Sequence, residues 1–345
     1  MGHKRFRLFG VVAVFLVLAT ACGSSGNNTP AAKQYKIGLV TDTGGLNDKS
    51  FNHLAFVGLE KAKQDFGIKD DVVESKTGDD YVPNLTNFAT TGHDLVIGVG
   101  FLMAEAVGTV SGQFPNVHFA IIDGAGTDSK GNDLKHANVE SLFFSEQDAG
   151  AMVGVIAGFL EKNGQAKKNK HVIGAVGGIS IPPVDHYIAG YIWAAKMEDP
   201  SISVLVGYSN EFSDPTKCKP VAQSQVNQGA DILFQVAGGC GVGVLQEGTQ
   251  AGVYSIGVDA DQKDVDPSVI ASALKKVDIA TYTAIKNVVN GNFQGGALTF
   301  SIQNGGAGYQ LDNLSPVPSG LQAELDKVQG EIKSGALTPP NNRTW

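Results

Sequence analysis

Short apolar runs alternate with amphipathic segments along most of the chain. Lys36–Val40 has the composition of a buried strand, and residues 50–67 follow it after a Gly-rich turn. Within this second segment the apolar side chains recur at helical spacing, at Phe51, Leu54, Ala55, Leu59 and Ala62. Gly67 is the expected end of the helix. A strand followed by a helix in this way predicts βαβ units and parallel sheets.

The same alternation continues in two series. The first series predicts strands at Val72–Glu74, Leu95–Val99, His118–Ile122 and Asn138–Phe143. The second predicts them at Val172–Val176, Ser203–Val206, Ile232–Val236 and Tyr254–Val258. Helices are expected at Glu146–Lys162, which is rich in Ala and Gly on one face, and at about Val184–Lys196, Thr216–Gln228, Gly241–Ala251 and Leu321–Lys333, with another ending at Val289.

Two series of strands in 345 residues predict two domains, because one hydrophobic core rarely serves so long a chain. The chain is expected to return to the first lobe near Ser272. We therefore assign residues 35–144 and about 273–303 to lobe one, and residues 145–272 and about 304–345 to lobe two. The expected fold class is α/β, with two doubly wound parallel-sheet lobes joined by a hinge that the chain crosses more than once.

The first residues carry the marks of export. Lys4, Arg5 and Arg7 precede an apolar run, Leu8–Leu18, that is too short to span a bilayer. The following LATAC resembles a bacterial lipobox, which predicts a signal peptide at residues 1–21 and a lipid on Cys22. An ordinary secretory signal with a chance cysteine is the alternative. Residues 22–34 lack apolar periodicity and are expected to form a flexible tether.

Charge narrows the class of partner. The chain carries a net charge of −8, and loss of residues 1–21 removes three basic groups and no acids, which leaves about −11. Such a surface repels phosphate backbones, so we expect no nucleic-acid partner.

Cysteine usage also narrows the possibilities. Besides Cys22 the chain has only Cys218 and Cys240. In an oxidising compartment an even pair predicts a disulfide, with two buried free thiols as the alternative. Two cysteines are too few for a metal framework, and we expect no metal.

Unusual side chains follow several strands, where ligands bind in open α/β sheets. Asp42, Asp123 and Asp259 fall at strand ends, Lys275 follows Asp259 along the chain, and two aromatics, Phe51 and Phe212, fall in or beside turns. Taken singly, such aspartates are often helix caps and such phenylalanines are often core residues. Their convergence on one edge of two facing sheets favours a site for a flat ligand with hydroxyl groups.

A nucleotide cofactor is not expected. Gly239, Gly241 and Gly243 are spaced G-x-G-x-G, which differs from the dinucleotide-binding fingerprint.

At this point the chain resembles a known family. The blocks VTDTGGLNDKSFN, LVIGVGF, FAIIDG, VGGISIPPV, EFSDPTKCK, GADILFQVAGGCGVGV, IGVDADQ and SALKKVD look like those of the basic membrane lipoproteins, the purine-nucleoside receptor-like substrate-binding proteins of ABC transporters. The resemblance runs from about Tyr35 to Thr338. It implies a type I periplasmic-binding-protein fold with three interlobe crossings, no catalytic activity and no cofactor.

The resemblance also implies roles for single residues. In the family two phenylalanines sandwich the purine, and Phe51 and Phe212 occupy the matching positions. Asp123 matches the acid that pairs with the base edge. Asp42, Asp259 and Lys275 match family positions that hold the sugar or line the pocket. Asn52 and Gly238 are weaker matches to such positions. Cys218 and Cys240 depart from small residues common in the family, so the preferred base could differ from that of relatives.

We therefore expect a monomeric binding protein for a purine nucleoside (guanosine, inosine or adenosine). It would be lipid-anchored at the extracytoplasmic face of the cell membrane and would deliver its ligand to ABC permease and ATPase subunits. The alternatives are a binding protein for another nucleoside or a sugar-like ligand, a nucleoside hydrolase, and a surface adhesin or antigen without a cleft.

Overall fold

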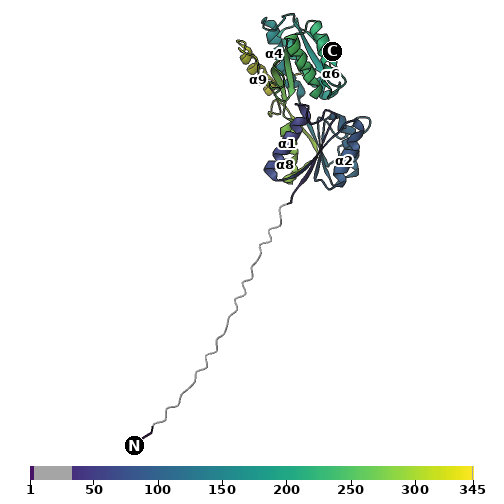
Figure 1. Cartoon of the computed structure of the whole chain (residues 1–345), viewed down its shortest axis with the longest axis vertical. Coiled ribbons are helices and arrows are strands. Elements are labelled where there is room, and N and C mark those ends of the chain that lie inside the picture. Colours follow the sequence, from purple (N-terminus) through teal and green to yellow (C-terminus); the bar gives the residue numbers. More distant parts are fainter. Residues whose placement is uncertain (4–32, 344) are drawn as a thin grey trace. The chain divides into compact units, whose positions relative to one another are not determined.

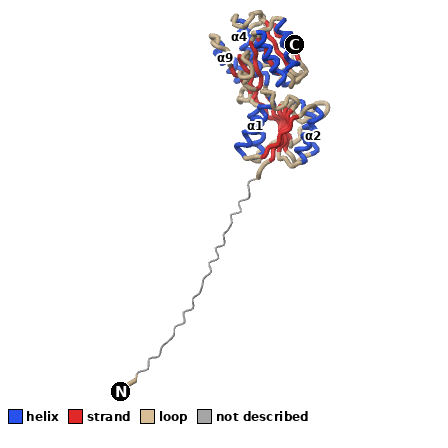
Figure 2. The backbone as a smooth tube through the Cα atoms, viewed as in Figure 1, coloured by secondary structure: helices blue, strands red, loops and turns tan. Residues whose placement is uncertain are grey.

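Two six-stranded sheets organise the chain. The computed structural model describes residues 1–3, 33–343 and 345, and residues 34–345 form one unit. The first sheet has the order β11-β5-β4-β3-β1-β2, with every neighbouring pair parallel. Figures 1 and 2 show helices on both sides of this sheet. Its strands are β1 (Lys36–Thr41), β2 (Lys69–Glu74), β3 (Leu95–Val99), β4 (His118–Ile122), β5 (Val139–Phe144) and β11 (Gly296–Phe300).

The second sheet has the order β12-β10-β9-β8-β6-β7. Its edge strand β12 runs antiparallel to β10, and the other neighbouring pairs are parallel. Its strands are β6 (Val172–Gly177), β7 (Ser203–Tyr208), β8 (Ile232–Val236), β9 (Tyr254–Asp259), β10 (Val269–Lys275) and β12 (Ala307–Leu311). The α/β class with two mostly parallel sheets is confirmed, and the antiparallel edge strand β12 was not expected.

Helices cover both faces of each sheet, and each face has its own hydrophobic cluster. We call the first sheet and its helices lobe one, and the second sheet and its helices lobe two. Lobe one packs α1 (Phe51–Phe66) and α8 (Val277–Val289) on one face and α2 (Tyr81–Thr90) and α3 (Ala104–Gln113) on the other. Lobe two packs α4 (Glu146–Lys162), α5 (Pro182–Glu198) and α9 (Leu321–Ser334) on one face and α6 (Pro215–Asn227) and α7 (Val242–Ala251) on the other.

Small residues let α4 and α5 approach closely, as the Ala/Gly-rich face of the first helix predicts. A Cβ atom added to Gly150 would lie 2.1 Å from the carbonyl oxygen of Tyr187, and one added to Gly154 would lie 2.4 Å from that of Tyr191. Contacts this short are impossible for a real side chain. The glycines therefore fix the distance between the two helices.

The chain passes between the lobes at three places: before α4, before α8, and between β11 and β12. These segments are hydrogen-bonded to one another. The backbone N–H of Ser145 donates to the carbonyl of Phe300 at 2.8 Å, and that of Lys276 donates to the carbonyl of Gly306 at 2.9 Å. β10 stays in the second sheet as far as Lys275. The residue boundaries expected for the two lobes stay a prediction.

Candidate functional site

A cavity lies where loops of the two sheets meet, and all the residues that the sequence predicts to bind a ligand line it. It encloses about 570 Å³ that protein atoms do not fill, part of it open to solvent. The eight predicted ligand-binding residues all line it: Asp42, Phe51, Asn52, Asp123, Phe212, Gly238, Asp259 and Lys275. Their role in binding stays a prediction.

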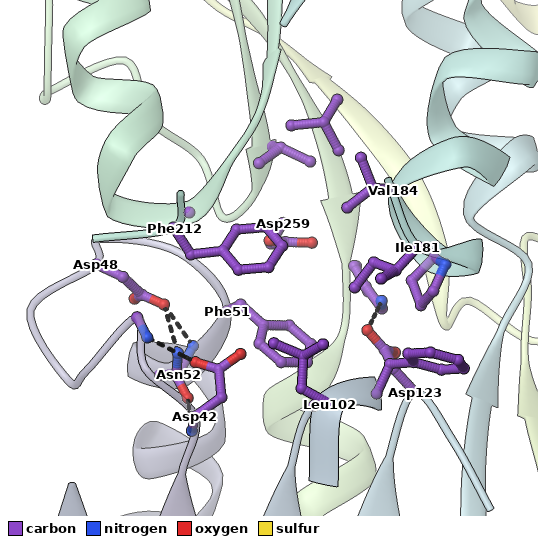
Figure 3. Close-up of a pocket in the computed structure, with 18 of the residues that line it drawn as sticks. Asp42, Asp48, Phe51, Asn52, Leu102, Asp123, Ile181, Val184, Phe212 and Asp259 are labelled. Atoms are coloured by element: carbon purple, nitrogen blue, oxygen red, sulfur yellow. Dashed lines mark hydrogen bonds and ion pairs between the residues drawn. The ribbon is translucent and has the colours of Figure 1, made fainter. Parts of the chain in front are cut away.

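The loop between β1 and α1 supplies one polar end of the cavity. Asp42 Oδ1 accepts hydrogen bonds from the Gly44 N–H at 2.8 Å and from Asn52 Nδ2 at 2.7 Å, and the Asp42 N–H donates to Asn52 Oδ1 at 3.2 Å. Burial, opposed by the hydrogen bonds from Asn52 and Gly44, raises the pKa of Asp42 to about 6. Figure 3 shows Asp42, Asp48 and Asn52 grouped together, apart from Asp123.

Asp123 and Lys275 form a buried ion pair at the other polar end. Lys275 Nζ lies 2.6 Å from Asp123 Oδ2 and 2.9 Å from Glu146 Oε1, and the side chains of all three are at most 6% exposed. Burial would lower the pKa of Lys275, but the carboxylates of Asp123 and Glu146 outweigh it and hold that pKa above its usual value. Burial raises the pKa of Asp123 to about 7, although the charge of Lys275 opposes the shift.

The second oxygen of Asp123 is the polar atom of this cavity that most needs a partner. Asp123 Oδ1 is buried and accepts no hydrogen bond within the described residues. A buried acceptor without a donor is costly, so this atom is a natural contact for a donor on a ligand. Asp123 adopts φ of 68° at the end of β4, a left-handed conformation that aspartate tolerates better than most residues.

Asp259 ends β9 on the lobe-two side of the cavity. Its Oδ1 accepts a hydrogen bond from the Tyr187 hydroxyl at 3.0 Å, and its Oδ2 accepts one from the Ser50 hydroxyl at 2.7 Å. Burial raises the pKa of Asp259, while the charge of Lys275 opposes that shift. Its φ is 61°, close to that of Asp123. Both carboxylates that follow central strands are thus held by left-handed backbone.

Two of the aromatic rings that line the cavity are the predicted phenylalanines, one from each lobe, and Phe101 and Tyr187 also line it. Phe51 begins α1, and Phe212 lies in the loop between β7 and α6 (Figure 3). Lys275 Nζ lies 5.1 Å from the centre of the Phe51 ring. A Cβ added to Gly178 would lie 2.3 Å from Phe212 Cε1, so the absence of a side chain there allows the ring its position.

Several contributors were not predicted from the sequence. Asp48, Phe101 and Tyr187 line the cavity, and Glu146, which does not line it, contacts the lining residue Lys275. Only Asp48 could have been predicted from the sequence, as an acid three residues before the start of a helix, where it caps the first turn. The apolar part of the lining includes Leu102, Ile181, Pro183 and Val184.

Cys218 and Cys240 are fully buried and joined by a bond of 2.04 Å between their sulfur atoms. Cys218 lies inside α6 and not in a turn, whereas Cys240 belongs to the short 3-10 turn Gly238–Gly241. The pair holds α6 beside the turn that carries the lining residue Gly238. Oxidation of the pair in the protein stays a prediction, which the intact mass of the unfolded, unreduced chain tests.

The expected signal peptide, the lipid site at Cys22 and most of the tether lie outside the described residues. Among the residues that the structure does describe, no helix is both long and apolar enough to cross a membrane.

A family model and the sequences of known proteins assign the chain to the same family. The family of PnrA-like ABC transporter substrate-binding proteins, Bmp, matches residues 36–343. An uncharacterised lipoprotein of Pyrococcus abyssi is 32% identical, over 96% of this chain and 81% of that protein. A Lactococcus lactis protein named an ABC transporter nucleoside-binding protein is 29% identical, over 92% of each chain.

A solved structure agrees with these sequence matches. The crystal structure of an ABC transporter solute-binding protein from Aeropyrum pernix K1 superposes with a TM-score of 0.80 at 27% identity, over 89% of this chain and 94% of that one. The family match over nearly the whole folded chain, together with the two sheets and the cavity between them, shows that the chain belongs to the Bmp family of PnrA-like ABC transporter substrate-binding proteins.

Proposed function

We propose that the chain binds a purine nucleoside (guanosine, inosine or adenosine) in this cavity and delivers it to the permease and ATPase subunits of an ABC importer. One arrangement carries the proposal. Phe51 and Phe212 enter one cavity from different lobes, and Asp123 lines the same cavity with a buried Oδ1 that has no partner among the described residues.

The aromatic pair accounts for the base. A purine is flat and presents a π-face on each side, and stacking on an aromatic side chain contributes about 1–3 kcal/mol per base. Asp123 Oδ1 can accept a hydrogen bond from the N–H groups that each of the three purines carries on its edge. Pairing with that donor would remove the cost of the unpartnered oxygen.

The remaining polar groups account for the sugar. Asp42 and Asp259 are acceptors and Lys275 is a donor, a combination that suits hydroxyl groups, which both donate and accept. Among the described lining residues Lys275 is the single basic side chain, against the acids Asp42, Asp48, Asp123 and Asp259. This balance favours a ligand without negative charge. The name of the lactococcal relative, a nucleoside-binding protein, supports the same class of ligand.

Binding without catalysis is what the family of the chain supports. The described residues of the cavity wall include no Ser, Thr, Cys or His, the side chains that most often act as nucleophile or as their base. Within the same part of the chain no three His, Cys, Asp or Glu residues are grouped to hold a metal ion. The family consists of substrate-binding proteins.

Isothermal titration calorimetry tests the proposal with guanosine, inosine and adenosine against uridine, free hypoxanthine and ribose. We expect tight one-to-one binding of at least one purine nucleoside and weaker binding of the base or the sugar alone. Preference for uridine or for ribose would contradict a purine nucleoside as the ligand, and would favour a binding protein for another nucleoside or for a sugar. Incubation of inosine with the protein, followed by an assay for free hypoxanthine, tests for hydrolysis, and steady release would contradict a binding protein.

The anchor is proposed on the sequence and on relatives that are named lipoproteins. We infer that Cys22 carries a lipid that holds the protein at the extracytoplasmic face of the membrane, where two lipid chains suffice for stable attachment. Cys22→Ala should move the protein from the membrane fraction to the soluble exported fraction of expressing cells. Retention of the variant in the membrane fraction after a salt wash would contradict lipid anchoring at this residue.

A further inference from the structure

At the N-terminus of α1 the side chain of Asp48, and not that of the N-cap residue Ser50, accepts the hydrogen bonds of the first turn. Ser50 occupies the N-cap position, where a serine hydroxyl ordinarily accepts a hydrogen bond from the first turn, but its side chain makes no such bond. Asp48 does this work in its place. Asp48 Oδ1 accepts from the N–H groups of Ser50 at 2.9 Å and His53 at 3.1 Å, and its Oδ2 accepts from the N–H of Asn52 at 2.7 Å.

The Ser50 hydroxyl therefore remains available to donate a hydrogen bond to lobe two. It lies 2.7 Å from Asp259 Oδ2 and 3.2 Å from the carbonyl oxygen of Val258, both at the end of β9 in lobe two. The hydroxyl carries one proton, and the shorter contact to a charged acceptor identifies the carboxylate as its main partner. Ser50 is fully buried, so water cannot replace this donor without movement of the loop.

A second bond joins the same two segments. Gln262 Nε2 in lobe two donates to the carbonyl oxygen of Lys49 at 3.2 Å. Gln262 is itself fixed, because its Oε1 accepts from Gln235 Nε2 at 2.6 Å and from the Val258 N–H at 3.1 Å. The lobe-one loop thus meets a rigid, fully buried part of lobe two.

From these contacts we propose that Ser50 is a positioning residue that couples the orientation of Asp259 to closure of the two lobes. As regards the ligand, this builds on the proposed function, in which Asp259 contacts the bound nucleoside. Asp259 receives one donor from each lobe, Tyr187 from lobe two and Ser50 from lobe one. The Ser50 bond can exist only while the loop of lobe one lies against the end of β9. We therefore expect the Asp259 carboxylate to reach this orientation only when the lobes are closed.

Loss of the hydroxyl has two expected effects on binding. A hydrogen bond to a charged group contributes enough that its removal should speed ligand release about ten- to a hundredfold. It should also raise the pKa of Asp259, because a donor to the charged form is gone. The other groups that act on Asp259 are the charges of Lys275, Asp48 and Asp123 and the hydroxyl of Tyr187, and the substitution leaves them in place.

Stopped-flow release of guanosine, inosine and adenosine tests the coupling with Ser50→Ala, Ser50→Gly and Ser50→Thr. Thr keeps the hydroxyl and should restore the parent rate, whereas Ala and Gly should both release ligand faster. Their affinity should begin to fall at a higher pH than that of the parent, an effect that simple loss of packing would not produce. Ser111→Ala is the matched control, because Ser111 is also a fully buried serine but lies on α3 and does not line the cavity.

Small-angle X-ray scattering of the ligand-free variants gives a readout that needs no nucleoside. We expect a larger radius of gyration for Ser50→Ala and Ser50→Gly than for the parent, Ser50→Thr and Ser111→Ala. If no nucleoside binds the parent, the proposed function fails while this comparison still decides the coupling. Equal radii for all variants, or unchanged release rates and pH profiles where ligand binds, would overturn the role of Ser50.

Discussion

At the scale of single residues, two aspartates define how the cavity presents its acceptors. Asp123 and Asp259 each follow a central strand and each take a left-handed backbone conformation, with φ of 68° and 61°. Non-glycine residues in this region carry a conformational cost that persists only where the surrounding structure holds them. Here β4 and β9 hold them, and the turn aims each carboxylate into the cavity instead of toward a helix cap.

Phe212→Ala should weaken binding of the preferred nucleoside about ten- to a hundredfold, because it removes one stacking face worth about 1–3 kcal/mol. Calorimetry with the parent and the variant measures the change. Phe293→Ala is the control, since Phe293 stacks on His118 in lobe one and does not line the cavity. Equal affinity of Phe212→Ala and the parent would remove Phe212 from the site.

Glu161 predicts a pH dependence of stability outside the cavity. Burial first, and then a hydrogen bond shared with Asp231 and the charges of Asp231 and Asp199, raise the pKa of Glu161 to about 8, against a donor bond from the backbone of His171. The folded state then keeps a proton that the unfolded state releases above about pH 4.5. This contribution to stability is complete at low pH and is lost as the pH rises through about 8.

Glu161→Gln should flatten that dependence, because glutamine cannot ionise. Urea unfolding of both proteins at about pH 5 and about pH 9 gives the free energy of unfolding of each at both values. The loss on raising the pH should be smaller in the variant than in the parent. Glu105→Gln, on the exposed side of α3, should leave the parent's dependence unchanged. Parallel curves for Glu161→Gln and the parent would contradict the shared proton.

Site residues at strand ends could be predicted from the sequence, whereas contacts between residues far apart in the chain could not. Asp42, Asp123 and Asp259 could be placed because each directly follows a strand, and strand ends share one edge of a sheet. Glu146 could not, because its contact with Lys275 joins residues 129 positions apart, and no local pattern reports it. The Ser50 hydroxyl is a similar case, since a serine before a helix predicts a cap and not a bond to another lobe.

At the scale of elements, the glycines of α4 decide how lobe two packs. Gly150→Ala should destabilise the protein by roughly 1–3 kcal/mol, because the new methyl group would meet the backbone of α5 at 2.1 Å and force the helices apart. Gly330→Ala should instead stabilise it by up to about 1 kcal/mol, since Gly330 lies inside α9 with nothing within 4 Å of an added Cβ. Urea midpoints measure both shifts, and destabilisation of equal size in the two variants would contradict the packing account.

Periodicity predicted most strands and helices well because they are buried on one or both faces. It missed β10, and it missed β11 and β12, which fall in a Gly-rich stretch. β11 is exposed along nearly its whole length at a sheet edge, so its sequence has no apolar alternation to detect. The helices α2 and α3 were also not foreseen. α2 contains Pro83, and α3 is a short run of small residues with Gly108 against the backbone of Thr127.

At the scale of the whole molecule, sheet order determines where a ligand can bind. In the first sheet β1 lies between β2 and β3, and in the second sheet β6 lies between β7 and β8. In each sheet the chain therefore leaves the first strand toward one side and later continues on the other side. A crevice opens at the strand ends where the strand order reverses in this way. The three crossings near Ser145, Lys276 and residues 301–306 lie together and join the lobes through hydrogen bonds. A hinge of this kind lets two rigid sheets close on a ligand without disturbing either core.

Native mass spectrometry of the protein with guanosine, inosine and adenosine tests the central claim most directly, because one spectrum reports both binding and the fate of the ligand. The account predicts one intact nucleoside per chain for at least one of the three, and a smaller fraction of that adduct in Phe212→Ala at the same nucleoside concentration. It also predicts no accumulation of the free base over the incubation. Absence of an adduct with all three nucleosides, or conversion of inosine to hypoxanthine, would contradict it.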